Sequence, residues 1–192
     1  LHACCHNPTG ADLSDAQWSE VVGLCKEGGL VPFLDMAYQG FADGIEQDTV
    51  AIRAFSASGV QFFASSPFSK NFSLYGERVG ALTIVTASKD ESTRVMSQLK
   101  RVIRTNYSTP PIHGGALVAA VLASPELRQQ WEIELAGMRD RIRAMRTGLV
   151  DAIKATGCAQ DFAFVAMQRG MFSYTGLTAA QVERMREEFG IY

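Results

Sequence analysis

The feature of this sequence that most constrains its fold is the alternation of short apolar runs with amphipathic stretches over the first 107 residues. In the amphipathic stretches apolar residues recur every three or four positions, a spacing typical of helices. Strands that alternate with helices favour a largely parallel sheet, because each helix returns the chain to start the next strand in the same direction. The expected strands are 1–6, 30–38, 60–66 and 80–87, and the expected helices of this part are 14–27, 48–58 and 89–107.

The remainder of the chain is predicted to be mainly helical. Ser124 is expected to cap the longest helix, with Pro125 in its first turn, where a missing N–H costs nothing. Apolar residues repeat at spacings of three and four along one face of this helix, and its other face is charged. The remaining expected elements are helices at 112–123 and 178–190 and a hairpin over 161–176 that turns at Arg169 and Gly170.

Composition excludes several classes of protein. Hydrophobic residues make up 47% of the chain, enough for a packed core, so a disordered chain is not expected. The net charge of −2 comes without a basic stripe, which argues against nucleic-acid binding. The apolar runs are too short to cross a bilayer, so no membrane partner is expected. The four cysteines fit no disulfide framework, and a reducing, cytoplasmic location is therefore predicted.

A cluster of potential metal ligands stands at the start of the chain. It contains His2, Cys4, Cys5 and His6. Their spacing matches neither a zinc finger nor the ligand set of a catalytic zinc site. We therefore predict no metal site.

Three polar side chains follow the ends of expected strands, where ligands bind in sheets of this kind. Asp35 ends an apolar run, Tyr38 follows it in a turn, and Lys70 comes just after the next strand. Each has a simpler interpretation: a helix cap or structural ion pair for Asp35, a half-buried core residue for Tyr38, and a solvated surface amine for Lys70. A lysine that is partly removed from water can instead act as a nucleophilic amine toward a carbonyl compound.

Arg78 adds a possible anion clamp eight residues after Lys70, although it could equally pair with its neighbour Glu77. Hydroxyl groups that an anion could also use precede the lysine at Ser65, Ser66 and Ser69. An amine, an anion clamp, a carboxylate and a phenol together suit a ligand with a carbonyl, a phosphate and a basic nitrogen. Pyridoxal phosphate has these three groups.

The motifs HNPTG, DMAYQG and SKNFSLYGERVG, in this order and at these intervals, resemble those of the fold-type I aspartate and aromatic amino-acid aminotransferases. The resemblance continues through RTNYSTPPIHG, WEIELAGMRDRIRAMR, QRGMFSYTGL and REEFGIY, and so covers essentially the whole chain. It implies an α/β fold: part of the three-layer large domain that binds pyridoxal phosphate, with a mostly parallel sheet, and the start of a small α+β domain. The implied divisions are 1–123 for the large domain, 124–156 for a long connecting helix and 157–192 for the small domain.

The resemblance assigns a role to each residue of the expected site. Lys70 resembles the lysine that binds the cofactor covalently and later transfers the substrate proton. Asp35 resembles the acid that pairs with the pyridine nitrogen, and Asn7 and Tyr38 resemble the groups that hydrogen-bond the ring oxygen. Arg78 resembles the phosphate clamp.

Four further residues take roles in the cofactor, substrate and subunit contacts. Ser69 is expected to assist in cofactor binding. Arg104 resembles an arginine that reaches the active site of the neighbouring subunit and binds the distal carboxylate of a dicarboxylic substrate, and Ser108 resembles a contact across the same interface. Phe172 resembles an aromatic residue of the substrate pocket, although plain core packing explains it equally well. A homodimer with shared active sites is thus implied.

The implied reaction is a ping-pong transamination between an amino acid and a 2-oxo acid, through the pyridoxal and pyridoxamine forms of the cofactor. Aspartate or glutamate is the expected substrate, and aromatic amino acids are also plausible. Two alternatives remain: another fold-type I enzyme, such as a lyase or decarboxylase, and a non-catalytic fragment of an aminotransferase.

The sequence departs from the family in two respects. Pro67 stands where the family carries a small hydroxyl residue that contacts the phosphate, and proline offers neither a hydroxyl nor an N–H. Family chains are also about twice as long, and the resemblance implies that this chain is a central-to-C-terminal piece of one. The ring-stacking aromatic, the glycine-rich phosphate loop and the arginine for the substrate α-carboxylate would lie outside these 192 residues.

Overall fold

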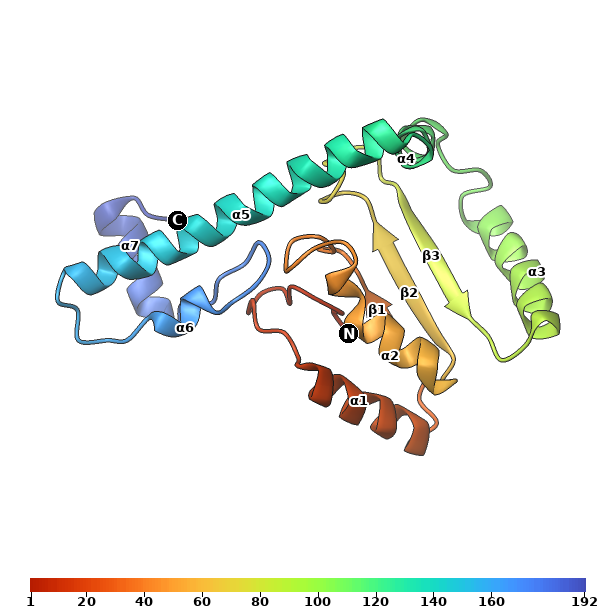
Figure 1. The fold of residues 1–192 in the computed structure, drawn as a ribbon, viewed down its shortest axis with the longest axis horizontal. Helices are drawn as coiled ribbons and strands as arrows, with labels where there is room; N and C mark the ends of the chain where they lie inside the picture. Colours follow the sequence, from red (N-terminus) through yellow and green to blue (C-terminus); the bar gives the residue numbers. More distant parts are fainter.

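The structure is a computed structural model that describes residues 1–192. A small sheet lies at its centre, and one long helix runs past the sheet toward the C-terminal helices (Figure 1). No helix is both long and apolar enough to cross a membrane. In chain order the elements are α1 (Asp15–Glu27), β1 (Phe33–Asp35), the 3₁₀ turn η1 (Gln47–Thr49), α2 (Val50–Ser58), β2 (Phe62–Pro67), β3 (Gly80–Val85), α3 (Lys89–Asn106), α4 (His113–Ala123), α5 (Pro125–Ala155), α6 (Ala163–Ala166) and α7 (Ala179–Phe189).

The sheet has three strands in the order β1-β2-β3 and is mixed, although the alternation of elements predicted a largely parallel sheet. β1 and β2 are parallel, with Asp35 opposite Ser65, whereas β2 and β3 are antiparallel. The chain between β2 and β3 contains no helix, so it turns back beside β2 instead of crossing over to enter in the same direction. The expected first strand, 1–6, is reduced to a single parallel bridge between His2 and Asp35.

The expected hairpin over 161–176 is wrong. Residues 163–166 form the short helix α6, and no strand follows it. The carbonyl groups of Gln168, Gly170 and Phe172, which a partner strand would have bound, accept hydrogen bonds from the side chain of Arg146 instead. A single side chain on α5 therefore replaces the strand pairing.

The core lies where the sheet meets α1, α2 and α5. Phe55 of α2, Phe62 of β2 and Leu34 of β1 are completely or almost completely buried in it. Leu135 of α5 joins the same cluster from a distant part of the sequence. The predicted caps of α1 and α5 are confirmed, since the hydroxyls of Ser14 and Ser124 each accept a backbone hydrogen bond from the first turn.

The turn after Tyr38 is built around the buried carboxylate of Asp48. Its two oxygens accept hydrogen bonds from the backbone N–H groups of Gly40, Ala42, Asp43 and Gly44, at 2.7, 3.1, 2.8 and 3.2 Å. Leu135 then packs directly on this turn: a Cβ added at Gly40 would lie 2.4 Å from its Cδ2, so no larger residue fits there. The turn therefore sets the distance at which α5 crosses the molecule.

We expect Asp48→Asn to destabilise the protein by about 2–4 kcal/mol, because an amide NH₂ would face buried N–H donors that now bind a carboxylate oxygen. Urea unfolding followed by circular dichroism measures this change in the free energy of unfolding. Glu46→Gln is the matched control: Glu46 pairs with Arg53 on the surface, and the expected loss is below about 1 kcal/mol. Equal losses in the two variants would show that the Asp48 carboxylate does not hold the turn.

Candidate active site

Asp35 uses one carboxylate oxygen for structure and leaves the other without a hydrogen bond. Its Oδ1 accepts hydrogen bonds from the N–H of Ala37 and from the hydroxyl of Ser65, both at 3.0 Å. The second contact follows from the parallel register of β1 and β2, which sets Asp35 beside Ser65. Oδ2 accepts no hydrogen bond and is not completely buried, so a ligand could donate a hydrogen bond to it. Ser65, considered above as an anion contact, orients Asp35 instead.

Tyr38 and Asn7 come together from two loops. Tyr38 is only 6% exposed, and its hydroxyl accepts a hydrogen bond of 3.3 Å from the side-chain amide of Asn7. The backbone of Asn7 donates to Nδ1 of His2 at 3.0 Å. Asp12 fixes the preceding loop by accepting from the N–H groups of Cys5 and His6. The amide and the phenol are thus held side by side without a regular element.

Lys70 lies half-buried in the loop after β2, above the ring of Tyr38. Its Nζ is 4.9 Å from the ring centroid and makes no hydrogen bond or ion pair. The ring face attracts the amine while it is charged, and the absence of a carboxylate partner leaves the amine free to react once it is neutral. The structure therefore brings Lys70, Tyr38 and Asn7 into one cluster.

Phe172 also contacts the ring of Tyr38. The two rings meet edge to face, with centroids 5.6 Å apart and planes at 88°. The segment that carries Phe172 approaches the start of the chain so closely that a Cβ added at Gly170 would lie 2.3 Å from Cβ of Cys5. Phe172 thus contacts Tyr38 and also packs against the core cluster, and its role in a substrate pocket stays a prediction.

Sequence reasoning missed Arg146, which holds this segment. Its guanidinium donates to the carbonyl groups of Gln168, Gly170 and Phe172 and to the hydroxyl of Ser173. Burial lowers the pKa of Arg146 from its ordinary value, but an arginine keeps its charge in proteins. The available signal was its position four residues after Ile142 and three before Leu149, inside the apolar stripe of the helix.

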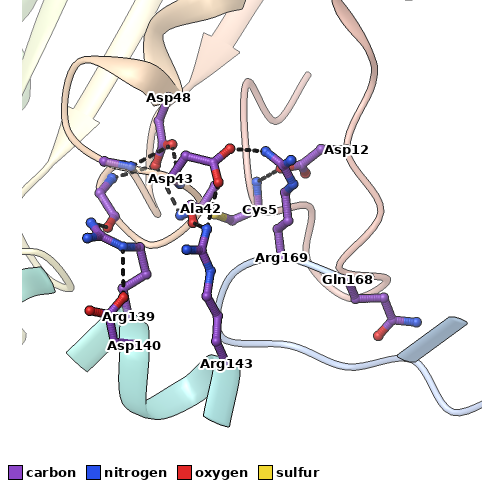
Figure 2. A network of polar contacts seen from close by, with 12 residues as sticks. Cys5, Asp12, Ala42, Asp43, Asp48, Arg139, Asp140, Arg143, Gln168 and Arg169 are labelled. Carbon is purple, nitrogen blue, oxygen red and sulfur yellow. Dashed lines mark hydrogen bonds and ion pairs between the residues drawn. The ribbon is translucent and has the colours of Figure 1, made fainter. Parts of the chain in front are cut away.

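Ion pairs tie the turn after Tyr38 to α5 and to the same C-terminal segment. Figure 2 shows that Asp43 lies between Arg143 and Arg169. Its Oδ1 is 2.6 Å from Nη2 of Arg143, and its Oδ2 pairs with Arg169. The backbone N–H of Arg169 also donates to the carbonyl of Gly10 at 2.7 Å. Three distant parts of the sequence are therefore joined beside the cluster.

The expected phosphate contacts are less clearly assembled. Arg78 is exposed and donates through Nη1 to the carbonyl of Tyr75 at 3.0 Å. Ser69 is half-buried and its hydroxyl makes no hydrogen bond, so it is free for a ligand. Pro67 pairs with Gly80 at the last position of the β2–β3 ladder, where a missing N–H does least harm.

Arg104 and Ser108 lie away from this cluster, at the exposed C-terminal end of α3. The guanidinium of Arg104 donates to the hydroxyl of Ser108, and neither side chain hydrogen-bonds any residue of the cluster. Within one chain the structure thus does not bring these two residues to Lys70.

The residues considered for metal binding are engaged in other contacts. Nδ1 of His2 accepts from Asn7, and Nδ1 of His6 contacts the Thr9 hydroxyl at 2.7 Å. Potential ligand atoms of Cys4, Cys5 and Asp48 do lie within 4.8 Å of one another, but both Asp48 oxygens are taken by backbone N–H groups. The pKa of the Cys4 thiol is raised, mainly by a hydrogen bond with Cys5 and to a smaller extent by burial. The thiol therefore stays protonated and is a poor metal ligand.

The cluster can bind a ligand with three kinds of group. The open oxygen of Asp35 suits a protonated ring nitrogen, the Asn7–Tyr38 pair suits an oxygen anion on the same ring, and the unpaired amine of Lys70 suits a carbonyl carbon. These polar groups therefore fit pyridoxal phosphate at its ring and its carbonyl, and Ser66, Ser69 and Arg78 lie nearby in the sequence for its phosphate.

Comparison with known proteins identifies relatives over the whole chain. Residues 1–192 match the family model for aminotransferase class I and II. The chain is 65% identical over 192 residues to an aspartate aminotransferase from Pseudomonas aeruginosa and 52% identical to an aromatic-amino-acid aminotransferase from Escherichia coli. All of this chain aligns in both cases, with 48% of each relative. The chain thus spans about half the length of these relatives, and its placement within them stays a prediction.

Solved structures agree with the sequence matches. An aromatic-amino-acid aminotransferase from Burkholderia pseudomallei, covalently bound to pyridoxal phosphate, superimposes with a TM-score of 0.98 at 69% identity. It is matched over all of this chain and 48% of its own length. An aromatic amino acid aminotransferase from Psychrobacter, crystallised with aspartic acid, gives a TM-score of 0.97 at 49% identity. By its sequence and by its fold, the chain belongs to the class I and II aminotransferases.

Proposed function

We propose that this chain forms the part of an aminotransferase active site that contains the reactive lysine. The enzyme would transfer amino groups to 2-oxo acids from aspartate, glutamate or aromatic amino acids. The observation that carries the proposal is the unpaired amine of Lys70 above the ring of Tyr38, next to the Asn7–Tyr38 hydrogen bond. Relatives named for aspartate and for aromatic amino acids support the two substrate classes. The relative that carries pyridoxal phosphate covalently supports the cofactor.

The cofactor supplies a carbonyl carbon for the amine and a ring that accepts electrons from the substrate α-carbon. Asp35 would hold the ring nitrogen in its protonated form through the oxygen that accepts no hydrogen bond in the protein. Asn7 and Tyr38 donate to the ring oxygen and stabilise its anionic form. With the cofactor bound, the amine of Lys70 would be the base that takes the proton from the substrate α-carbon.

Arg104, Ser108, Arg78 and Ser69 complete the proposal. Arg104 and Ser108 are exposed at the end of α3, as residues that serve a neighbouring subunit must be. We propose that they act in a homodimer, with Arg104 binding the distal carboxylate of a dicarboxylic substrate. Arg78 and Ser69 are proposed as phosphate contacts.

The same proposal divides the chain into a large domain (1–123), a connecting helix (124–156) and the start of a small domain (157–192). It also includes a cytoplasmic location.

Lysine-linked cofactor is the first expected outcome. The expressed polypeptide that carries this sequence is incubated with pyridoxal phosphate and reduced with borohydride, and the added mass is located by peptide mass spectrometry. We expect it on Lys70, and we expect no label at position 70 in Lys70→Ala or Lys70→Arg, because neither residue offers a primary amine that can condense with the cofactor carbonyl. Absence of label on Lys70 in the unsubstituted protein would contradict the cofactor proposal.

The class of reaction is decided by a half-reaction. Glutamate added without a 2-oxo acid should bleach the visible band of the lysine-bound cofactor and yield an equivalent of 2-oxoglutarate, because the amino group stays on the cofactor. Ammonia released in step with turnover would favour the alternative lyase, and carbon dioxide a decarboxylase. A band that no amino acid changes would favour the non-catalytic fragment.

Substrate choice should depend on Arg104. We expect Arg104→Leu to lower kcat/KM for aspartate by roughly 100-fold, the loss of a charge-assisted contact, with a much smaller effect on phenylalanine. Arg101→Leu is the control, because Arg101 lies on the same helix and its side chain makes no hydrogen bond or ion pair. An equal loss for both substrates would exclude the proposed contact with the distal carboxylate.

A further inference from the structure

Arg146 is a buried cation without a counter-ion. It lies on α5, is 6% exposed and forms no ion pair, although α5 is otherwise buried only at Leu135. Its three nitrogens make four hydrogen bonds, to Ser173 Oγ at 2.8 Å and to the carbonyls of Gln168, Gly170 and Phe172 at 2.6, 2.6 and 3.1 Å. A buried charge is costly unless such contacts compensate it. The four hydrogen bonds therefore compensate the buried charge and at the same time hold the segment 168–173 in place.

The segment 168–173 has no helix or strand of its own to keep it in place. Gly170, with φ of 81°, sits directly on Cys5, and the carbonyl of Phe172 sits against Gly10. The Phe172 ring is thereby set edge-on to Tyr38, whose ring also meets the amine of Lys70. A path of direct contacts thus leads from Arg146 through Phe172 and Tyr38 to Lys70.

We propose that Arg146 is a positioning residue for the Tyr38–Lys70 pair: it fastens segment 168–173 over Cys5 and so fixes Phe172 against the ring of Tyr38. The fastening of the segment is independent of any cofactor. The consequence for Lys70 rests on the proposed function. Each part therefore has its own measurement.

The first measurement uses the cysteines as local probes in the expressed protein without cofactor. Cys5 lies under segment 168–173, Cys25 is buried in α1 away from it, and Cys158 is exposed. In Arg146→Met, alkylation of Cys5 by N-ethylmaleimide, located by mass spectrometry, should become about tenfold faster or more, while Cys25 stays protected. Arg141→Met is the matched control, because Arg141 is on the same helix, exposed and without a hydrogen bond or ion pair.

A second variant covers the case in which Arg146→Met does not fold. Arg146→Lys keeps the positive charge but replaces the planar fork by a compact ammonium, which cannot reach three carbonyls and Ser173 together. We expect faster alkylation of Cys5 here as well, between the values of the unsubstituted protein and Arg146→Met. Equal acceleration at Cys5 and Cys25 in the variants that fold, or none at Cys5, would overturn the proposal, because Arg146 would then stabilise only the whole fold or nothing local.

The second measurement follows the visible band of the lysine-bound cofactor as a function of pH. A less firmly held Tyr38 donates a weaker hydrogen bond to the anionic ring oxygen and stabilises this anion less. The pH at which half of the band has changed should therefore rise in Arg146→Lys, by roughly half a unit to one unit. Phe172→Ala should give a similar shift, and the double variant no larger one, because both act through the same contact. Additive shifts, or an unmoved midpoint, would refute the path to Lys70. A missing band in the unsubstituted protein would refute the proposed function and leave the cysteine result to decide the fastening.

Discussion

The arrangement of this chain depends on a buried carboxylate that is neutralised by backbone amides. Asp48 gathers four N–H groups of the turn after Tyr38 and thereby fixes its course. Leu135 packs on that turn at Gly40, which sets the path of α5 across the molecule (Figure 1). The path of α5 in turn decides where Arg146 stands. The turn after Tyr38 therefore acts on the site around Lys70 indirectly, through the path of α5 and the position of Arg146.

Asp48 and Arg146 solve the same physical problem with opposite charges. Each is buried, and each is compensated by backbone dipoles instead of by a charged partner. An exposed ion pair tolerates small movements, whereas several short hydrogen bonds to one rigid group fix the backbone that provides them. One group shapes the turn below Tyr38 and the other the segment beside it. Such fixing suits a site in which an amine, a phenol and a carboxylate must keep their relative positions.

Local patterns in the sequence predicted the helices well and the strands less well. The helices have repeated apolar spacing and polar caps, such as Ser14 and Ser124, and both signals act within a few residues. The stretch 161–176 offered only short apolar runs around a glycine, which fit a hairpin as well as a short helix and a loop. Its structure depends on Arg146, whose partners are more than 20 residues away along the chain. The antiparallel entry of β3 was likewise hidden, because it follows from a connection without a helix.

By itself the sequence identified the family, through an ordered set of motifs, and predicted that Asp35, Tyr38, Asn7 and Lys70 belong to the site. The reason is that reactive groups must be particular residue types at the ends of particular strands. The residue type and its position along the chain can both be read from the sequence. Only the tertiary structure decided which groups touch. It set Phe172 against Tyr38, gave Ser65 to Asp35 and left Arg78 at the surface. It also made Arg146 a buried anchor, because a charge that leaves water is compensated by whichever polar groups the fold brings within reach.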